Sequence, residues 1–193
     1  MADSPKLTFH PLTPKRWADF ESLFGPRGAC GGCWCMFWKL PNKDFGDMAY
    51  DGNKAAQKEV VASGVVPGLL AYATGEAVGW IAVEPRSEYP RLARSRVLKP
   101  VDNKPVWSIT CFFTRKDFRG KGVTVALLQA AIDHAHKHGG KIVEGYPVEP
   151  REGKMPAAFV YTGLASAFRK AGFKEVVRNS ETRPIFRFVI GGR

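Results

Sequence analysis

The sequence predicts a single α/β domain over residues 1–193, and three observations carry that prediction. Residues 68–73 and 77–84 have the pattern of two strands, and the three residues between them, with Gly75, suit a hairpin connection. Residues 106–114 form a strong, largely apolar strand. Residues 121–138 repeat apolar side chains at helical spacing and stop at a pair of glycines. A chain of 193 residues can bury a core without disulfides or a metal.

The remaining elements complete an alternation of strands and helices. A short strand is expected at residues 7–10, followed by a helix that begins near Pro14 and continues to Phe24. The rest of the chain is assigned to an ordered loop (25–46), a helix (51–63), a polar segment with a short helix (85–105), a strand (141–148), a helix (164–171) and two closing strands (173–178 and 184–190). No segment has the composition of a linker, so we expect no domain boundary.

The strand at residues 106–114 should be buried on both faces. Strict alternation would place Trp107, Ile109, Cys111 and Phe113 on one face. The apolar Phe112 lies on the other, which indicates that both faces are covered.

The charge of the chain favours anionic partners. Lysine and arginine number 29 against 18 acids, which gives a net charge of +11. The charges are spread along the chain, as suits a polyphosphate cofactor or an acidic substrate, and no helix-turn-helix, zinc-finger or RNA-binding signature favours nucleic acid. No stretch approaches the roughly 20 apolar residues that span a bilayer, so no membrane partner is expected. The first residues resemble neither a signal nor a transit peptide, and we expect a cytoplasmic protein.

A turn that contains two glycines lies between the buried strand and the longest helix, over residues 119–124. Glycines let a backbone approach phosphate oxygens, and the first amides of a helix have no acceptor within it. Arg119 and Lys121 add positive charge. The spacing matches neither a Walker A loop nor a Rossmann fingerprint, and an ordinary turn would also use Gly120 and Gly122.

This turn resembles the pyrophosphate motif of the GNAT superfamily of N-acetyltransferases, Gln/Arg-x-x-Gly-x-Gly/Ala. Arg119, Gly122 and Thr124 stand at the motif positions, and Thr124 departs from the usual small residue. Residues 168–173 resemble the C-terminal signature of the superfamily, and the order of elements is similar from residue 7 to residue 190. The resemblance implies a mixed, mostly antiparallel central sheet of about seven strands with flanking helices.

The resemblance also implies a reaction and a cofactor site. Acetyl-CoA would be the co-substrate, and a primary amine of a small molecule or peptide would attack it directly in a ternary complex. The pantetheine arm would pair with the strand backbone, and the pyrophosphate would bind the turn. The residues assigned to the cofactor are Cys111, Phe112, Phe113, Thr114, Arg119, Gly120, Lys121, Gly122, Val123 and Thr124.

The proton-transfer residues are less defined. Glu144 interrupts an apolar strand and is either a base that serves the amine or a buried partner of one of the many arginines, and Glu149 is a second candidate base. The superfamily often uses a tyrosine as general acid at the position that Phe168 occupies here. The thiolate that coenzyme A forms on transfer would then take its proton from water, from Tyr161 or from Tyr146. Tyr161 could instead be a packed aromatic residue.

Residues 30–38 combine three cysteines with aromatic side chains. A structural zinc site needs four ligands, and no fourth is near, so we expect no metal. By resemblance, this loop would line the acceptor pocket; a buried plug of packed side chains is the alternative. The residues assigned to the acceptor are Trp34, Met36, Phe37, Trp38 and Tyr146. An acyl-cysteine intermediate on Cys111 or Cys33 is a further hypothesis, although no adjacent histidine would activate the thiol.

Two other functions compete with catalysis. The missing tyrosine would suit a non-catalytic acyl-CoA sensor of the same fold, and the basic charge would suit a nucleic-acid-binding module whose affinity falls steeply with salt. The sequence leaves open the identity of the amine and whether the chain forms a homodimer.

Overall fold

The computed structural model describes residues 5–47, 49–150 and 159–192. Within them, seven strands form one sheet in the order β1-β2-β3-β4-β5-β7-β6. The strands are β1 (Thr8–Pro11), β2 (Gly68–Ala73), β3 (Glu76–Pro85), β4 (Trp107–Thr114), β5 (Ile142–Gly145), β6 (Lys174–Arg178) and β7 (Pro184–Val189). The β4–β5 pair is parallel, and the other pairs of named strands are antiparallel. The expected mixed, mostly antiparallel sheet is confirmed.

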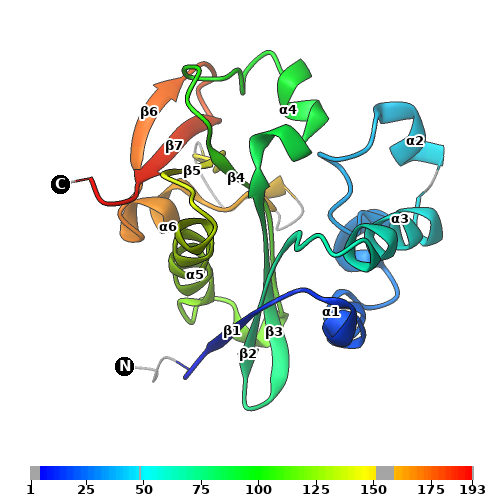
Figure 1. Cartoon of the computed structure of the whole chain (residues 1–193). Helices are drawn as coiled ribbons and strands as arrows, with labels where there is room; N and C mark the ends of the chain where they lie inside the picture. The colour runs from blue at the N-terminus through cyan, green and yellow to red at the C-terminus, as the bar shows by residue number, and fades with distance from the viewer. Residues whose placement is uncertain (1–4, 48, 151–158, 193) are drawn as a thin grey trace.

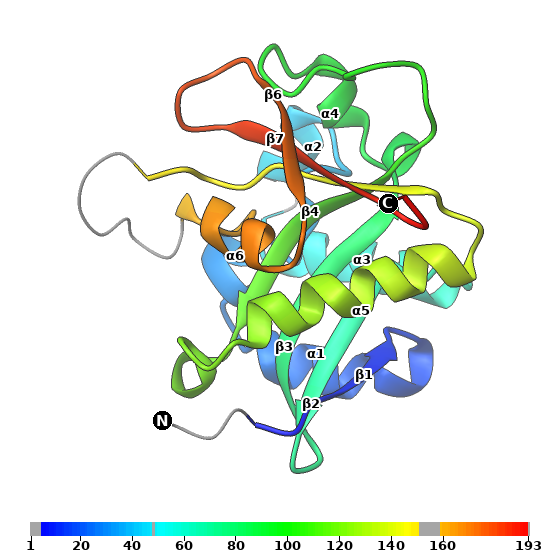
Figure 2. The ribbon, with the colours of Figure 1, turned by 90° about the vertical axis from the view of Figure 1, so that its left-hand side faces the viewer.

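Helices cover both faces of the sheet (Figures 1 and 2). α1 (Trp17–Phe24) and α3 (Asp51–Ala62) lie on one face, and α5 (Val123–Lys137) and α6 (Ala165–Lys170) lie on the other. The shorter segments are α2 (Asn42–Asp47), α4 (Pro90–Arg94), the 3₁₀ turns η1 (Pro14–Arg16), η3 (Arg86–Glu88) and η4 (Lys116–Phe118), and the irregular turn η2 (Gly28–Gly32). Among the described residues, no helix is long and apolar enough to cross a membrane.

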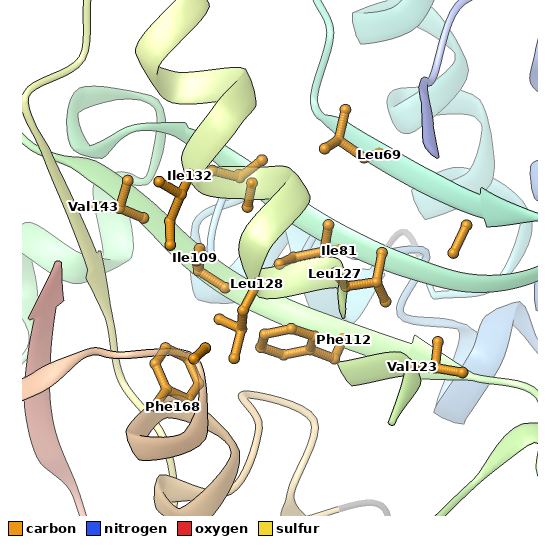
Figure 3. Close-up of a cluster of buried hydrophobic side chains, with 14 of the residues drawn as sticks. Leu69, Ile81, Ile109, Phe112, Val123, Leu127, Leu128, Ile132, Val143 and Phe168 are labelled. Carbon is orange, nitrogen blue, oxygen red and sulfur yellow. The ribbon is translucent and has the colours of Figure 1, made fainter. Parts of the chain in front are cut away.

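The larger core lies between α5 and the sheet (Figure 3). Leu127, Leu128 and Ile132 form the apolar stripe of α5 and contact buried side chains of β3 and β4. Phe168 of α6 closes the core below them and is fully buried. The helical period of the sequence therefore fixes which face of α5 meets the sheet, and with it the direction in which the first turn of α5 points.

A β-bulge interrupts the pairing of β3 with β4. Ala82 pairs with Cys111 and Val83 pairs with Ile109, so Thr110 is an extra residue on β4. A bulge leaves one residue unpaired and bends the strand.

Beyond the bulge, the side chains of β4 lie on the opposite face from the one that uninterrupted alternation would give them. Ile109 and Phe112 belong to the core under α5, whereas Cys111 and Phe113 contact the cluster under α1. The expectation that Trp107, Ile109, Cys111 and Phe113 share one face is therefore wrong, because it assumed uninterrupted alternation. The bulge brings Cys111 to the same side of the sheet as the cysteine-containing loop.

Two further expectations differ from the structure. The segment expected to be a loop contains α2, and the strand expected at residues 141–148 ends at Gly145. β5 pairs with β4 only from Trp107 to Ile109, after which the chain leaves the sheet. The edge of β4 beyond Ile109 is thus not covered by β5.

Replacing Leu128 with alanine tests the packing of α5. The side chain is fully buried, so Leu128→Ala should lower the free energy of unfolding by roughly 2–5 kcal/mol, measured by denaturant titration. His136→Ala, at an exposed position of the same helix, is the control and should stay within about 0.5 kcal/mol of the wild type. Equal effects of the two substitutions would contradict this packing.

Candidate functional site

The uncovered edge of β4 forms one wall of a cavity. The cavity has a volume of about 240 Å³ and lies between the end of β4, the start of α5 and the segment that leads into α6. Its lining residues are Phe112, Phe113, Thr114, Arg119, Thr124, Val160, Gly163, Leu164 and Ala167. Five of these were assigned to the cofactor from the sequence, so the structure brings the strand residues and the turn residues together.

A second cavity of about 300 Å³ adjoins the first at the N-terminus of α5. Its lining residues are Thr114, Phe118, Arg119, Gly120, Gly122, Val123, Thr124, Val125, Leu164, Ser166, Ala167 and Lys170. Both cavities share Thr114, Arg119 and Thr124, so a groove runs from the β4 edge to the first turn of the helix.

The backbone at this helix terminus is arranged to receive an anion. Gly120 and Gly122 have φ angles of +76° and +80°, a conformation that side chains rarely adopt, and a Cβ at either would contact nothing within 4 Å. Gly122 precedes the first residue of α5, and no side chain caps the helix. The first amides of α5 therefore remain available to a ligand, with the positive end of the helix dipole behind them.

Arg119 and Lys121 flank these amides. Arg119 Nε donates a hydrogen bond to the Thr114 carbonyl oxygen over 3.1 Å, which links the end of β4 to the turn. Lys121 lies with its Nζ 5.2 Å from the centre of the Phe118 ring. Neither cation forms an ion pair with a carboxylate of the described residues. Their charges are therefore free to attract a phosphate.

The β4 edge already has hydrogen-bond partners from its own chain. The Phe112 amide donates to the Tyr161 carbonyl oxygen over 2.6 Å, and the Thr114 carbonyl accepts from Arg119. A ligand that pairs with this edge as an extra strand would therefore compete with the Tyr161 carbonyl for the Phe112 amide.

The Tyr161 side chain lies on the side of the sheet that holds Cys111. Burial raises the pKa of its hydroxyl to about 12; Arg183 opposes this shift, and the nearby Cys111 and Cys33 thiols add to it. The hydroxyl therefore keeps its proton near neutral pH and is a weaker acid than an unperturbed tyrosine. Its ring lies 6.2 Å from the ring of Phe37.

Glu144 has the arginine partners that its alternative interpretation expected. The carboxylate is fully buried, with Arg86 Nη1 3.0 Å from Oε1 and Arg187 Nε 2.7 Å from Oε2. The Tyr146 hydroxyl donates to Oε1 over 2.7 Å. Both oxygens are thus engaged, which suits a structural partner of the arginines, and the catalytic role of Glu144 stays a prediction.

Tyr146 and Glu149 lie apart from the cavities. Tyr146 is fully buried, and its hydroxyl also contacts Ser108 over 2.8 Å, so it faces the Glu144 network. Glu149 forms surface ion pairs with Arg169 and Arg178, and the Arg169 hydrogen bond holds the pKa of Glu149 below its usual range.

Glu84 is a second buried carboxylate, and it was not predicted from the sequence. Glu84 of β3 is 2% exposed, and Lys39 Nζ lies 2.8 Å from its Oε1 and 2.7 Å from its Oε2. Burial raises the pKa of Glu84, and Lys39 counteracts the shift. An acidic residue at the end of an apolar strand was the signal that could have identified it.

The loop with three cysteines divides into a buried and a partly exposed half. Trp34 is 3% exposed and stacks on the rings of Trp17 and Phe24, and Met36 is 2% exposed. These two residues match the interpretation as a plug. Phe37 and Trp38 remain partly exposed and lie near Tyr161, as residues of an acceptor pocket would.

Two thiols meet beneath this loop. Cys35 Sγ lies 2.9 Å from Cys111 Sγ and accepts a hydrogen bond from the Trp80 indole N–H over 3.1 Å. Burial raises the pKa of Cys35 well above its usual range and that of Cys33 to about 11, so both are protonated and weakly nucleophilic near neutral pH. In the described part of the chain, no three His, Cys, Asp or Glu side chains are grouped to hold a metal ion.

Known proteins share this architecture. Residues 34–152 match the acetyltransferase (GNAT) family. An acetyltransferase of the GNAT family from Listeria monocytogenes has a similar structure, with a TM-score of 0.61, 8% identity and 98% of each chain covered. No curated protein matches the chain in sequence.

Two similar structures contain a ligand. The PaiA N-acetyltransferase from Thermoplasma acidophilum, in complex with coenzyme A, has a TM-score of 0.53 and 14% identity over 95% of this chain and 99% of that one. The protein yncA from Salmonella typhimurium, described as an acetyltransferase with its cofactor acetyl-CoA, has a TM-score of 0.53 and 13% identity over 97% and 95%. Identities this low show the fold alone. The family match covers more than half of the residues, and it shows that this chain belongs to the GNAT family of acetyltransferases.

Proposed function

We propose that this acetyltransferase transfers an acetyl group from acetyl-CoA to a primary amine, by direct attack within a ternary complex. The groove from the β4 edge to the N-terminus of α5 is the observation that carries the proposal. Coenzyme A and acetyl-CoA are the ligands of the structurally similar PaiA and yncA proteins. The cytoplasmic location, a single domain and a homodimer stay predictions from the sequence.

The residues of the groove fit the two chemical parts of coenzyme A. The amides at the start of α5, with Arg119 and Lys121, suit the charged pyrophosphate. The cavity along Phe112 and Phe113 has apolar walls, as a neutral pantetheine arm requires. Thr124 lines both cavities, so its hydroxyl would lie where the two parts join.

The transfer needs one new bond and two proton movements. The amine nitrogen attacks the thioester carbonyl, the C–N bond forms and the C–S bond breaks. The thiolate of coenzyme A that leaves takes a proton, and Tyr161, whose hydroxyl is protonated near neutral pH, is the candidate donor from the sequence. The proton that the amine loses goes to water or to a carboxylate, for which Glu144 is the candidate from the sequence.

The proposal is tested by thiol release from acetyl-CoA over a panel of primary amines, with Tyr161→Phe beside the wild type. General acids contribute about 10²–10⁴-fold, and we expect Tyr161→Phe to lower kcat by about 100-fold while the Kd of acetyl-CoA stays unchanged. Tyr72→Phe is the matched control, because the Tyr72 hydroxyl donates to Asp19 and the residue takes no part in the contact between Tyr161 and the β4 edge. Its kcat should equal that of the wild type.

Two results would count against this assignment. Binding of acetyl-CoA without thiol release for any amine would favour the acyl-CoA sensor, for which the absence of a hydroxyl at the buried Phe168 is the supporting observation. An unchanged kcat in Tyr161→Phe would leave water as the proton donor.

Gly122→Glu tests the phosphate site. It places a carboxylate beside the first amides of α5 at a position with φ of +80°, and the Kd of coenzyme A should rise at least about tenfold by calorimetry. Gly139→Glu is the matched control at the other end of α5, where φ is also +80° and a Cβ also meets nothing within 4 Å. It introduces the same charge and similar strain, so it should leave the Kd unchanged. If both variants bind coenzyme A with the same Kd, the pyrophosphate does not bind at the start of α5.

A further inference from the structure

We propose that the primary amine accepted by this enzyme also carries a carboxylate, and that the guanidinium of Arg91 binds it. The inference rests on the proposed acetyl transfer and narrows the class of the acceptor to amino carboxylates. It stands on the surroundings of Arg91, on its position near Tyr161, and on the polar groups that surround the Tyr161 hydroxyl.

Arg91 extends from α4 into an aromatic environment. Its guanidinium carbon lies 4.3 Å from the centre of the Phe37 ring and 5.0 Å from that of Phe45. Nε donates to the Leu40 carbonyl oxygen over 2.6 Å, which fixes the direction of the side chain. Its two terminal nitrogens make no hydrogen bond to the described residues, so a planar pair of donors remains free.

The charge of Arg91 has no counterion among the described residues. Five other arginines pair with carboxylates, namely Arg86, Arg115, Arg169, Arg178 and Arg187, whereas Arg91, like Arg119, does not. Partial burial lowers the pKa of Arg91, because desolvation disfavours the charged form, and Cys33 and Tyr161 oppose this shift. A bound anion would remove that cost, because a partly buried cation is stabilised most by a paired, hydrogen-bonded partner.

Further polar groups lie near the Tyr161 hydroxyl. The Trp38 indole N–H is buried and has no hydrogen bond of normal geometry, although it is close enough to the Tyr161 hydroxyl to lower the pKa of that group. Arg183 acts on Tyr161 as well, and its Nη1 donates to the Thr162 hydroxyl over 3.1 Å. Apolar walls with a few free polar groups are typical of small-molecule sites.

The position of Arg91 connects it to the reaction. Phe37 contacts the guanidinium of Arg91, and the centre of its ring lies 6.2 Å from that of Tyr161. The backbone of Tyr161 in turn bonds the β4 edge at Phe112. A carboxylate held by Arg91 would therefore anchor an acceptor whose amine points toward that edge.

The chemistry favours a carboxylate over a phosphate ester. The two terminal nitrogens of a guanidinium match the two oxygens of a carboxylate in one plane. Among aromatic walls, a single guanidinium neutralises a monoanion, whereas a phosphate monoester would bring close to two negative charges.

The experiment compares matched pairs of amines with the acetyl-CoA-loaded enzyme. The pairs are glycine, β-alanine, 4-aminobutyrate, 6-aminohexanoate and 4-(aminomethyl)benzoate, each with its carboxamide. We expect at least one carboxylate to exceed its carboxamide by about tenfold or more in kcat/KM, the size of one good charged contact. 2-Aminoethyl phosphate is the probe for the phosphate class.

Arg91→Gln should abolish this preference, by lowering kcat/KM for the carboxylate to that of the carboxamide. Arg91→Lys keeps the charge without the paired donors and should retain part of the preference. Arg94→Gln, on the exposed side of the same helix, is the matched control and should behave as the wild type. Unchanged Tm and Kd for acetyl-CoA in all three variants would show that fold and cofactor site are intact.

The inference is overturned if every carboxylate and its carboxamide react equally, if Arg91→Gln lowers both members of a pair equally, or if 2-aminoethyl phosphate is the better substrate. If no amine is acetylated, the proposed function fails, and calorimetry with the same pairs on the CoA-saturated protein decides this inference separately. Tighter binding of a carboxylate than of its carboxamide, lost in Arg91→Gln, would support it. Equal binding, or none, would overturn it.

Discussion

The parting of β4 from β5 is the constraint on which the rest of the site depends. β4 pairs with β3 along its length but with β5 only as far as Ile109. Backbone amides and carbonyls that lose a strand partner must find another, because leaving them unpaired in a protein interior is costly. The chain supplies the Tyr161 carbonyl and Arg119, and the cavity along this edge exists because β5 does not continue.

A buried carboxylate links the strands where β4 and β5 are still paired. Glu144 on β5 joins Arg86, which follows β3, to Arg187 on β7, so one carboxylate links three parts of the sheet. Removing one member of such a group leaves an uncompensated charge and typically costs about 3–5 kcal/mol. The ion pair of Glu144 with Arg187 therefore holds β5 against β7 one residue before the pairing of β5 with β4 ends.

The sequence predicted those features that depend on local pattern. The helical stripe ending at Ala135 and the turn at Gly120 and Gly122 are contiguous signals, and both were located correctly. The bulge at Thr110 was not predicted, because one extra residue in an apolar strand leaves no mark in composition. α2 was not predicted, because its six residues include Gly46 and bury no side chain.

Features that depend on distant residues could not be derived in the same way. Glu144 meets Arg86 and Arg187 across 58 and 43 positions of the chain, so its two interpretations could not be separated from the sequence. The same holds for Cys35 and Cys111, which are 76 positions apart and become neighbours only because the bulge turns Cys111 toward the loop. Only the three-dimensional pairing assigns these side chains their partners.

Tyr161 contributes to both sides of the opening at the β4 edge, with its backbone on one side and its side chain on the other. The carbonyl of Tyr161 holds the β4 edge, and its ring, on the same Cα, stands beside Phe37 in the aromatic loop. Gly163, with a φ of +87°, follows two positions later and allows the segment to turn there. A displacement of the Tyr161 backbone away from Phe112 would therefore also shift the ring that lies beside Phe37. A ligand that moved this backbone on one side of the strand would thus change the aromatic contact on the other side, and any such linkage between two binding events acts equally in both directions.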